Sequence, residues 1–244
     1  MQPAQPDSYP ATARTTPTRL RERAGYQADA VHAVLDEALI CHLGYVVDGE
    51  PVVLPTIHAR VGQTLYVHAS SGARLARSIP DDGLPVCVTV TLLDGLVLAR
   101  SHFHHSMNYR SVVAHGRAHL VSDPQERAEA LAAIVEHVAA GRSAVTRGPD
   151  GKELAATAVF RLPLNEVSLK SRSGPPKDDD PDLALPYWAG EMPVNTGYGP
   201  PVPAPDLGAH AAAVPEHVSR YRRPVSERSS AGGPGPDRRS AASG

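Results

Sequence analysis

Residues 41–70 read CHLGYVVDGEPVVLPTIHARVGQTLYVHAS, and this stretch decides the fold. Asp48-Gly49 and Gly62-Gln63 are turn-forming pairs that interrupt runs rich in Val, Thr and Tyr. They separate three strand-like runs: 41–47, 51–61 and 64–70. Because the turns between these runs are short, the sequence predicts an antiparallel meander here.

The remainder of the body adds strands and helices. An apolar stripe predicts a helix over 29–40, and Pro and Gly bound an amphipathic helix over 124–141. A shorter helix is expected over 73–79. Further strands are expected at four places: 84–93, 96–101, 111–121 and 156–174. About six antiparallel strands with two or three outer helices predict a mainly β protein built on a small closed barrel.

Three features interrupt these later strands. Asp94-Gly95 is expected to form a hairpin turn between two of them. Residues 102–110, HFHHSMNYR, break the apolar pattern. Gly116 is expected at a bulge or at a point of close approach.

The two ends of the 244-residue chain differ from its body. Residues 1–18 are rich in Pro, Thr and Ala, and residues 196–244 are rich in Pro, Gly, Ser and Arg. Such segments bury too little apolar surface to offset the entropy lost on ordering. The composition therefore predicts one folded domain over 19–195 between two disordered ends.

Charge and cysteine content exclude several classes of protein. The formal net charge of −2 creates no field that would attract nucleic acid or an anionic membrane. Cys41 and Cys87 are too few and too far apart for a disulfide framework or a zinc site. No apolar run approaches the length of a membrane span. We therefore expect a soluble, cytoplasmic protein that binds neither nucleic acid nor membranes.

Familiar catalytic loops are absent from the sequence. It contains no G-x-G-x-x-G after a strand, no G-x-x-x-x-G-K-[ST] and no G-x-S-x-G. Hydrolase activity is accordingly disfavoured.

The segment HASSGARLAR, residues 68–77, is a candidate anion site. A strand ends there, two serines follow, and Gly72 permits the turn into a short helix. The first turn of a helix has unpaired N–H groups, Ser70 and Ser71 add donors, and Arg74 can clamp a phosphate with two bonds. The alternative is an ordinary serine-capped helix with surface arginines.

A second polar cluster precedes the strand at 111–121. Asn108 can bond the amide-like edge of a ring, Tyr109 can stack, and Arg110 can bind an anion, with Ser111 beside them. The alternative is a solvated loop.

Histidines form a third set. His102 and His104 would share one face of an extended strand, as would His115 and His119. Converging neutral imidazoles can bind a metal or haem iron. No Cys, Asp or Glu accompanies them at ligand spacing, so we predict structural histidines and no metal site.

Four segments carry a family resemblance: CHLGYVVDGEPVVLPT (41–56), LYVHASSGARLARSI (65–79), SMNYRSVVAHGRAHLV (106–121) and LPYWAGEMPV (185–194). Taken in order, they resemble the flavin-binding split-barrel family that includes the pyridoxamine 5′-phosphate oxidases. Together they span most of residues 19–195. They are most similar to the flavin-nucleotide-binding branch that also contains nitroimidazole-resistance reductases.

The resemblance implies a six-stranded antiparallel split β-barrel with flanking helices, assembled as a homodimer with two FMN molecules at the interface. It implies that twelve residues bind the cofactor: Pro55, Thr56, Ile57, His68, Ser70, Ser71, Arg74, Asn108, Tyr109, Arg110, Ser111 and Trp188. Among these, Trp188 would cover the flavin ring; its alternative role is a plain core or interface tryptophan.

One difference from the pyridoxamine phosphate oxidases argues against vitamin B6 oxidation as the activity. No arginine follows Trp188 until the tail, whereas pyridoxamine phosphate oxidases grip the substrate phosphate there with an arginine. The resemblance therefore implies an FMN-dependent oxidoreductase for another small organic molecule. The alternative is a flavin- or haem-binding sensor or carrier with little turnover, and a deazaflavin is the alternative to FMN within the fold.

Overall fold

The computed structural model describes residues 7–208 and 213–227. Their chain forms two compact units. The first comprises residues 7–92, 111–170, 196–208 and 213–227, and the second comprises 93–110 and 171–195. Residues 1–6, 209–212 and 228–244 lie outside the described residues, and with them parts of both ends that the composition predicts to be disordered.

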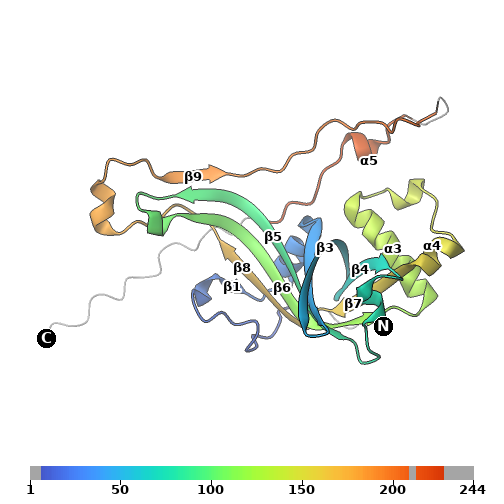
Figure 1. Cartoon of the computed structure of the whole chain (residues 1–244). Coiled ribbons are helices and arrows are strands. Elements are labelled where there is room, and N and C mark those ends of the chain that lie inside the picture. The colour runs from blue at the N-terminus through green and yellow to red at the C-terminus, as the bar shows by residue number, and fades with distance from the viewer. Residues whose placement is uncertain (1–6, 209–212, 228–244) are drawn as a thin grey trace. The chain divides into compact units, whose positions relative to one another are not determined.

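Six antiparallel strands close into a ring (Figure 1). Their order is β6-β7-β4-β3-β2-β5, and β5 pairs with β6 to complete it. The bounds are β2 Ile40–Val47, β3 Glu50–Val61, β4 Thr64–Ser70, β5 Leu84–Leu98, β6 Ser106–Leu120 and β7 Thr157–Pro163. Three strands lie outside the ring: β8 (Glu166–Arg172) beside β6, β1 (Ala24–Gly25) beside β8, and β9 (Gly190–Pro193) beside β5. The predicted mainly β fold is confirmed.

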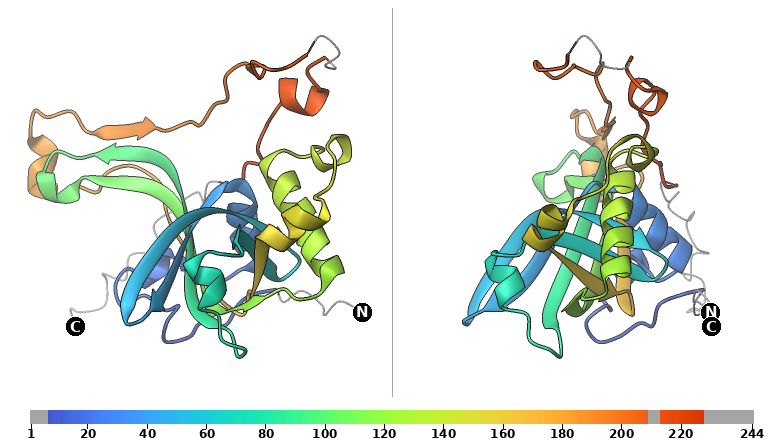
Figure 2. Two further views of the ribbon diagram at one scale, coloured as in Figure 1. Left: turned by 45° about the vertical axis from the view of Figure 1, so that its right-hand side comes forward. Right: turned by 90° about the vertical axis from the view of Figure 1, so that its right-hand side faces the viewer.

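Helices pack against the ring strands in the first unit. The helix α1 (Ala28–Glu37) contacts β3, and α3 (Pro124–Val138) contacts β3, β4 and β7 (Figure 2). Both match the predicted helices, and Asp123 caps α3 by accepting a bond from the Glu126 amide at 2.7 Å. The remaining helices are short: α2 Arg74–Arg77, α4 Gly151–Ala156, α5 Glu216–Ser219, and the 3-10 turns η1 Arg21–Arg23, η2 His102–His104, η3 Ser143–Val145 and η4 Asp180–Ala184. No helix among the described residues is both long and apolar enough to cross a membrane.

The apolar core lies inside the first unit. The α1 stripe (Val31, Val34 and Leu35) packs there with inward residues of β5 and β7 such as Val90 and Phe160. Tyr9 joins the same core, and its hydroxyl bonds His32 Nε2 and Gln63 Oε1, each at 2.7 Å. Composition gives no signal of this N-terminal anchor. The domain boundaries expected at residues 18 and 195 stay predictions.

The predicted hairpin turn at Asp94-Gly95 is wrong. A tight I′ turn needs positive φ at both central residues, as Asp48 (55°) and Gly49 (81°) have between β2 and β3. Asp94 and Gly95 lie instead inside β5, where Gly95 pairs with Pro193 of β9. A Cβ on Gly95 would lie 3.1 Å from the Met192 carbonyl oxygen, so glycine permits β9 to approach. The chain turns later, through η2, before β6 begins at Ser106.

The expected break over 102–110 is therefore shorter than predicted, because β6 already includes Asn108 and Arg110. Gly116, by contrast, is confirmed as a point of close approach. A Cβ there would lie 2.6 Å from Cδ1 of Leu162 on the neighbouring strand β7.

Candidate functional site

The sheet opens between β3 and β4 in the first unit. Residues 50–57 of β3 pair with β2, and residues 58–61 pair with β4. The last rung between β3 and β4 joins His58 to Val67, after which β4 continues to Ser70 alongside β7. Beyond that rung no described strand pairs with the second edge of β3. Every other residue there points its backbone N–H and C=O groups into the opening.

The residues expected to bind a cofactor lie on both sides of this split. Pro55, Thr56 and Ile57 form the β3 side, and His68, Ser70, Ser71 and Arg74 follow β4 on the other. Ile57 and His68 are each one residue beyond the last rung. The structure thus brings together seven of the twelve residues that the family resemblance implies.

The β4 side of the split is exposed to solvent and makes few hydrogen bonds to the rest of the protein. The Ser71 amide donates to the Ala156 carbonyl at 2.8 Å, and Ser70 Oγ accepts from the Gly72 amide at 3.3 Å. Arg74 Nη2 lies 2.9 Å from Asp48 Oδ2, with side chains 52% and 83% exposed. Ion pairs as exposed as this one contribute little, so Arg74 can exchange Asp48 for another anion. The helix α2 is one turn long, so its N-terminus adds little to the site.

His68 contributes an unusual nitrogen at the split. Its Nδ1 is buried and has no hydrogen-bond partner among the described residues. Burial lowers the pKa of His68, because the charged imidazolium loses hydration there. A neutral ring with an unpartnered nitrogen fits a position that a ligand atom completes.

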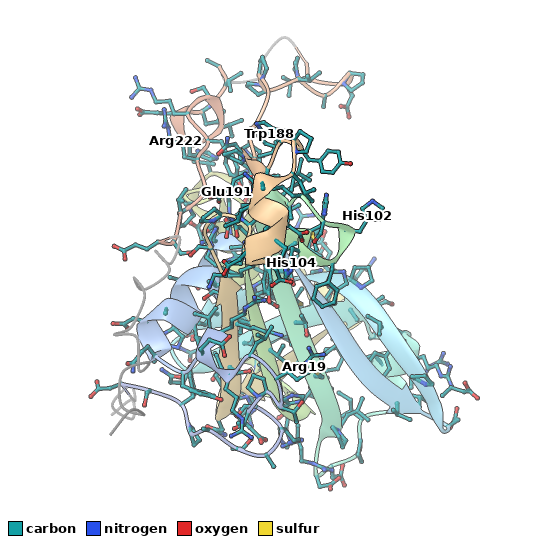
Figure 3. All side chains as sticks on the ribbon, turned by 90° about the vertical axis from the view of Figure 1, so that its left-hand side faces the viewer. Arg19, His102, His104, Trp188, Glu191 and Arg222 are labelled. Atoms are coloured by element: carbon teal, nitrogen blue, oxygen red, sulfur yellow. The ribbon has the colours of Figure 1, made fainter. Side chains whose placement is uncertain are left out.

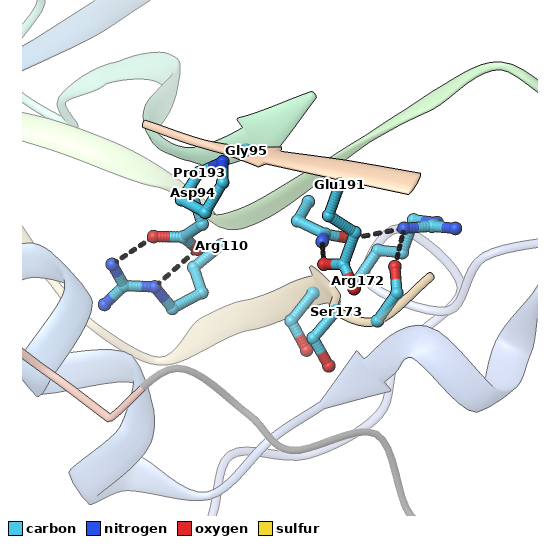
Figure 4. Close-up of a pocket in the computed structure, with 10 residues that line it drawn as sticks. Asp94, Gly95, Arg110, Arg172, Ser173, Glu191 and Pro193 are labelled. Carbon is cyan, nitrogen blue, oxygen red and sulfur yellow. Dashed lines mark hydrogen bonds and ion pairs between the residues drawn. The ribbon is translucent and has the colours of Figure 1, made fainter. Parts of the chain in front are cut away.

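The second unit contains a separate polar pocket of about 130 Å³ (Figure 4). Asn108 and Arg110 line it from β6, Asp94 from β5 and Glu191 from β9. Arg110 holds Asp94 through two bonds, Nε to Oδ2 at 2.9 Å and Nη2 to Oδ1 at 2.7 Å. Asn108 Nδ2 donates to Glu191 Oε2 at 2.5 Å.

Arg172 completes the pocket. Its Nη1 donates to Asn108 Oδ1 and to the Gly174 carbonyl. The two guanidinium groups and two carboxylates balance, so the lining carries no net charge. Asp94, Arg172 and Glu191 were not predicted from the sequence; the isolated charge of Asp94 within an apolar strand was the available signal.

Three of the expected residues lie elsewhere. Ser111 Oγ donates to the Val90 carbonyl at 2.9 Å within the first unit, and Tyr109 does not line the pocket. Trp188 is 69% exposed, so it is not a core residue, and its ring lies within 3.0 Å of where a Gly190 Cβ would stand.

The histidines His102 and His104 lie in the second unit (Figure 3). They belong to the turn η2 and do not share a strand face, which corrects the prediction. His104 Nε2 lies 3.2 Å from Asp179 Oδ2, the rings of His102 and His105 are 6.4 Å apart, and Phe103 between them is exposed. In the described part of the chain, no group of three His, Cys, Asp or Glu side chains is arranged to hold a metal ion.

Comparison with known proteins shows which family and which solved structures this chain is similar to. Residues 27–171 match the model of a family described as pyridoxamine 5′-phosphate oxidase. The fold is similar to the flavocytochrome Anf3 from Azotobacter vinelandii, with 39% sequence identity over 87% of this chain and 98% of that chain and a TM-score of 0.81. It is also similar to the FAD and heme binding protein from Mycobacterium smegmatis, with 35% identity over 82% of this chain and 98% of that chain and a TM-score of 0.77. No curated protein matches the sequence.

Proposed function

The chain belongs to the pyridoxamine 5′-phosphate oxidase family, and from this premise we propose that it is a flavin-dependent oxidoreductase whose cofactor lies between β3 and β4. The observation that carries the proposal is the split at the His58–Val67 rung, with free backbone on one side and hydroxyl and guanidinium groups on the other. Because a fold alone does not determine function, these groups carry the assignment.

The β3 side suits the flavin ring. Alternate backbone groups in the stretch from Pro55 to Ile57 can pair with donors and acceptors of the ring's polar edge, and Pro55 contributes at most its carbonyl, because proline has no N–H. Across the split, His68 Nδ1 supplies one more polar atom that has no protein partner. Because its pKa is lowered, His68 is a neutral hydrogen-bonding group at pH 7.

The β4 side suits the phosphate. Ser70, Ser71 and Arg74 are exposed, and the partners of Arg74 are a solvent-exposed carboxylate at 2.9 Å and the Val47 carbonyl at 3.4 Å. Arg110 is less suited to this role, because Asp94 already holds its guanidinium through two bonds in a buried position. We therefore assign the phosphate to Arg74.

A bound flavin supplies hydride or electron transfer at its ring. The protein binds the phosphate, orients the ring along β3 and shields it from water. The family resemblance also implies that Asn108, Tyr109, Arg110 and Ser111 of a second copy enter the same cleft, and that Trp188 covers the ring. A homodimer is therefore part of the proposal, and light scattering of the purified protein tests it.

The proposal predicts a yellow protein when the chain is purified without added cofactor. Its absorption spectrum should show one flavin per chain, and mass spectrometry of the released cofactor should identify FMN or FAD, with a deazaflavin as the alternative. Stopped-flow bleaching by NADH or NADPH, followed by reoxidation with a small acceptor, tests the redox activity. Flavin that is bound but never reduced would support a carrier and contradict the oxidoreductase.

A specific observation favours a second candidate function, that of a flavin- and haem-binding electron carrier or sensor. Two proteins that match most of this chain at 39% and 35% identity are named as a flavocytochrome and as an FAD and heme binding protein. In this chain His102, His104 and His105 cluster at one exposed turn beside Phe103. An imidazole next to exposed aromatic surface is a suitable axial ligand for haem.

Haem titration separates the two candidates. The second candidate predicts a Soret band in the wild-type protein that is lost or shifted in His102→Ala or His104→Ala. The control is His42→Ala, which changes an exposed histidine in the first unit. A Soret band identical in all four proteins would exclude the η2 histidines as ligands.

A further inference from the structure

Side chains from three distant parts of the chain cap the C-terminal end of α1. The last four carbonyls of a helix have no partner within it. Here His58 Nε2 bonds the Leu35 carbonyl at 2.9 Å, and His137 Nε2 bonds the Ala38 carbonyl at 2.8 Å. Between them, Arg223 donates to the carbonyls of residues 36 and 37, with Nη2 at 2.5 and 3.1 Å. Four consecutive carbonyls are thus satisfied by β3, α3 and the C-terminal segment.

Arg223 also reaches the end of α3. Its Nη1 donates to the His137 carbonyl, in the last turn of that helix. The C-terminal ends of helices carry partial negative charge, and a guanidinium offers five donors in a rigid plane. One side chain therefore joins the ends of α1 and α3.

The segment around Arg223 is held at two further points. Tyr221 donates its hydroxyl proton to the Val138 carbonyl at 2.5 Å. Ser226 bonds the Glu37 carboxylate through its amide at 2.7 Å and its hydroxyl at 2.5 Å. We call residues 215–226, which include α5 and the chain that follows it, the strap (Figure 2).

The contacts of the strap continue to the split. The rings of His137 and His58 lie 4.7 Å apart, and His58 is fully buried. His58 also forms the last rung between β3 and β4, next to Ile57 on the open side. A chain of direct contacts therefore runs from Arg223 through His137 and His58 to the edge of the split.

From these contacts we propose that the strap is a conformational device that fixes the β3 side of the split. When Arg223 is in place, α1, α3 and the His58 end of β3 are held as one body. When it is released, the carbonyls of residues 36 and 37 lose their donors, and β3 opens locally around His58. This proposal does not depend on which cofactor the split holds.

Hydrogen exchange of the full-length protein, followed by mass spectrometry, tests the proposal. Arg223→Ala should accelerate exchange about tenfold or more in peptides covering 215–226 and 54–60, as expected for the loss of several charge-assisted hydrogen bonds. Arg222→Ala is the matched control, because Arg222 is exposed and, within the described part of the chain, makes no hydrogen bond or ion pair with α1 or α3. It should exchange like the wild type in both regions.

A second variant keeps the test informative if Arg223→Ala does not fold. Tyr221→Phe combined with Ser226→Ala removes the two flanking anchors and leaves Arg223 in place; it should accelerate exchange in both regions to a smaller extent. If either variant frees residues 215–226 while residues 54–60 stay as protected as in the wild type, the coupling is refuted. Rapid exchange of 215–226 in the wild type would refute the strap itself.

Discussion

Arg110 and Asp94 face each other across β6 and β5 in a two-bond ion pair whose side chains are only 4% and 9% exposed. The pair lies within the second unit, where Asp94 occupies a strand position between apolar neighbours. In such surroundings the ion pair offsets part of the hydration that both charges lose on burial.

Asp94→Asn should therefore lower the free energy of unfolding in urea by about 3–5 kcal/mol, since it removes a carboxylate that makes two bonds to a buried guanidinium. Glu153→Gln is the control: it breaks the Arg147–Glu153 pair, whose side chains are 69% and 46% exposed. That change should cost much less than Asp94→Asn, because solvent-exposed ion pairs contribute little to stability. Equal losses in the two variants would show that the Asp94 pair is no stronger than a surface pair.

His58 should make the stability of the protein depend on pH. Burial lowers the pKa of His58 to about 4, from an ordinary value of 6.5. The folded state thus binds fewer protons than the unfolded state between these values. The stabilisation is fully present above pH 6.5 and is lost as the pH falls towards 4, up to about 3 kcal/mol.

Urea titrations at several pH values check this expectation. His58→Gln keeps a side-chain donor for the Leu35 carbonyl but cannot titrate, so its stability should fall less steeply between pH 6.5 and 4. His42→Ala, at an exposed position of β2, should follow the wild-type slope. Parallel curves for wild type and His58→Gln would mean that His58 is not responsible.

Arg74 should contribute to flavin affinity through its charge. Arg74→Ala should weaken binding of FMN or FAD about tenfold, the effect expected for losing one charge-assisted bond to phosphate. Arg77→Ala is the matched control, on the same short helix and equally exposed. Quenching of flavin fluorescence during titration of the cofactor-free protein measures both. If Arg77→Ala has the larger effect, the assignment of the phosphate to Arg74 is wrong.

Local chemistry made much of the fold predictable. The turn at Asp48-Gly49 follows from the positive φ that such a pair tolerates, and α3 from its proline start and apolar period. Asp94-Gly95 has the same local signal, yet it lies inside β5, because pairing with Arg110 and β9 decides its conformation. A dipeptide cannot encode partners that are distant in the sequence.

In the candidate site, too, local features could be predicted from the sequence, whereas contacts between distant residues could not. The cluster from His68 to Arg74 is contiguous, so its polar chemistry is visible in the sequence. The role of the strap is not visible in the sequence, because Arg223 binds carbonyls that lie 186 and 187 positions earlier in the chain. Its surroundings in the sequence are Pro- and Arg-rich and have no apolar period, so nothing local distinguishes Arg223 from Arg222.

The most direct test of the central claim is the identity and amount of cofactor in protein purified without additions. We predict a flavin spectrum with close to one FMN or FAD per chain. We also predict that inorganic phosphate competes for that site in the wild type and competes less in Arg74→Ala. A colourless protein that binds neither FMN nor FAD on addition would contradict it.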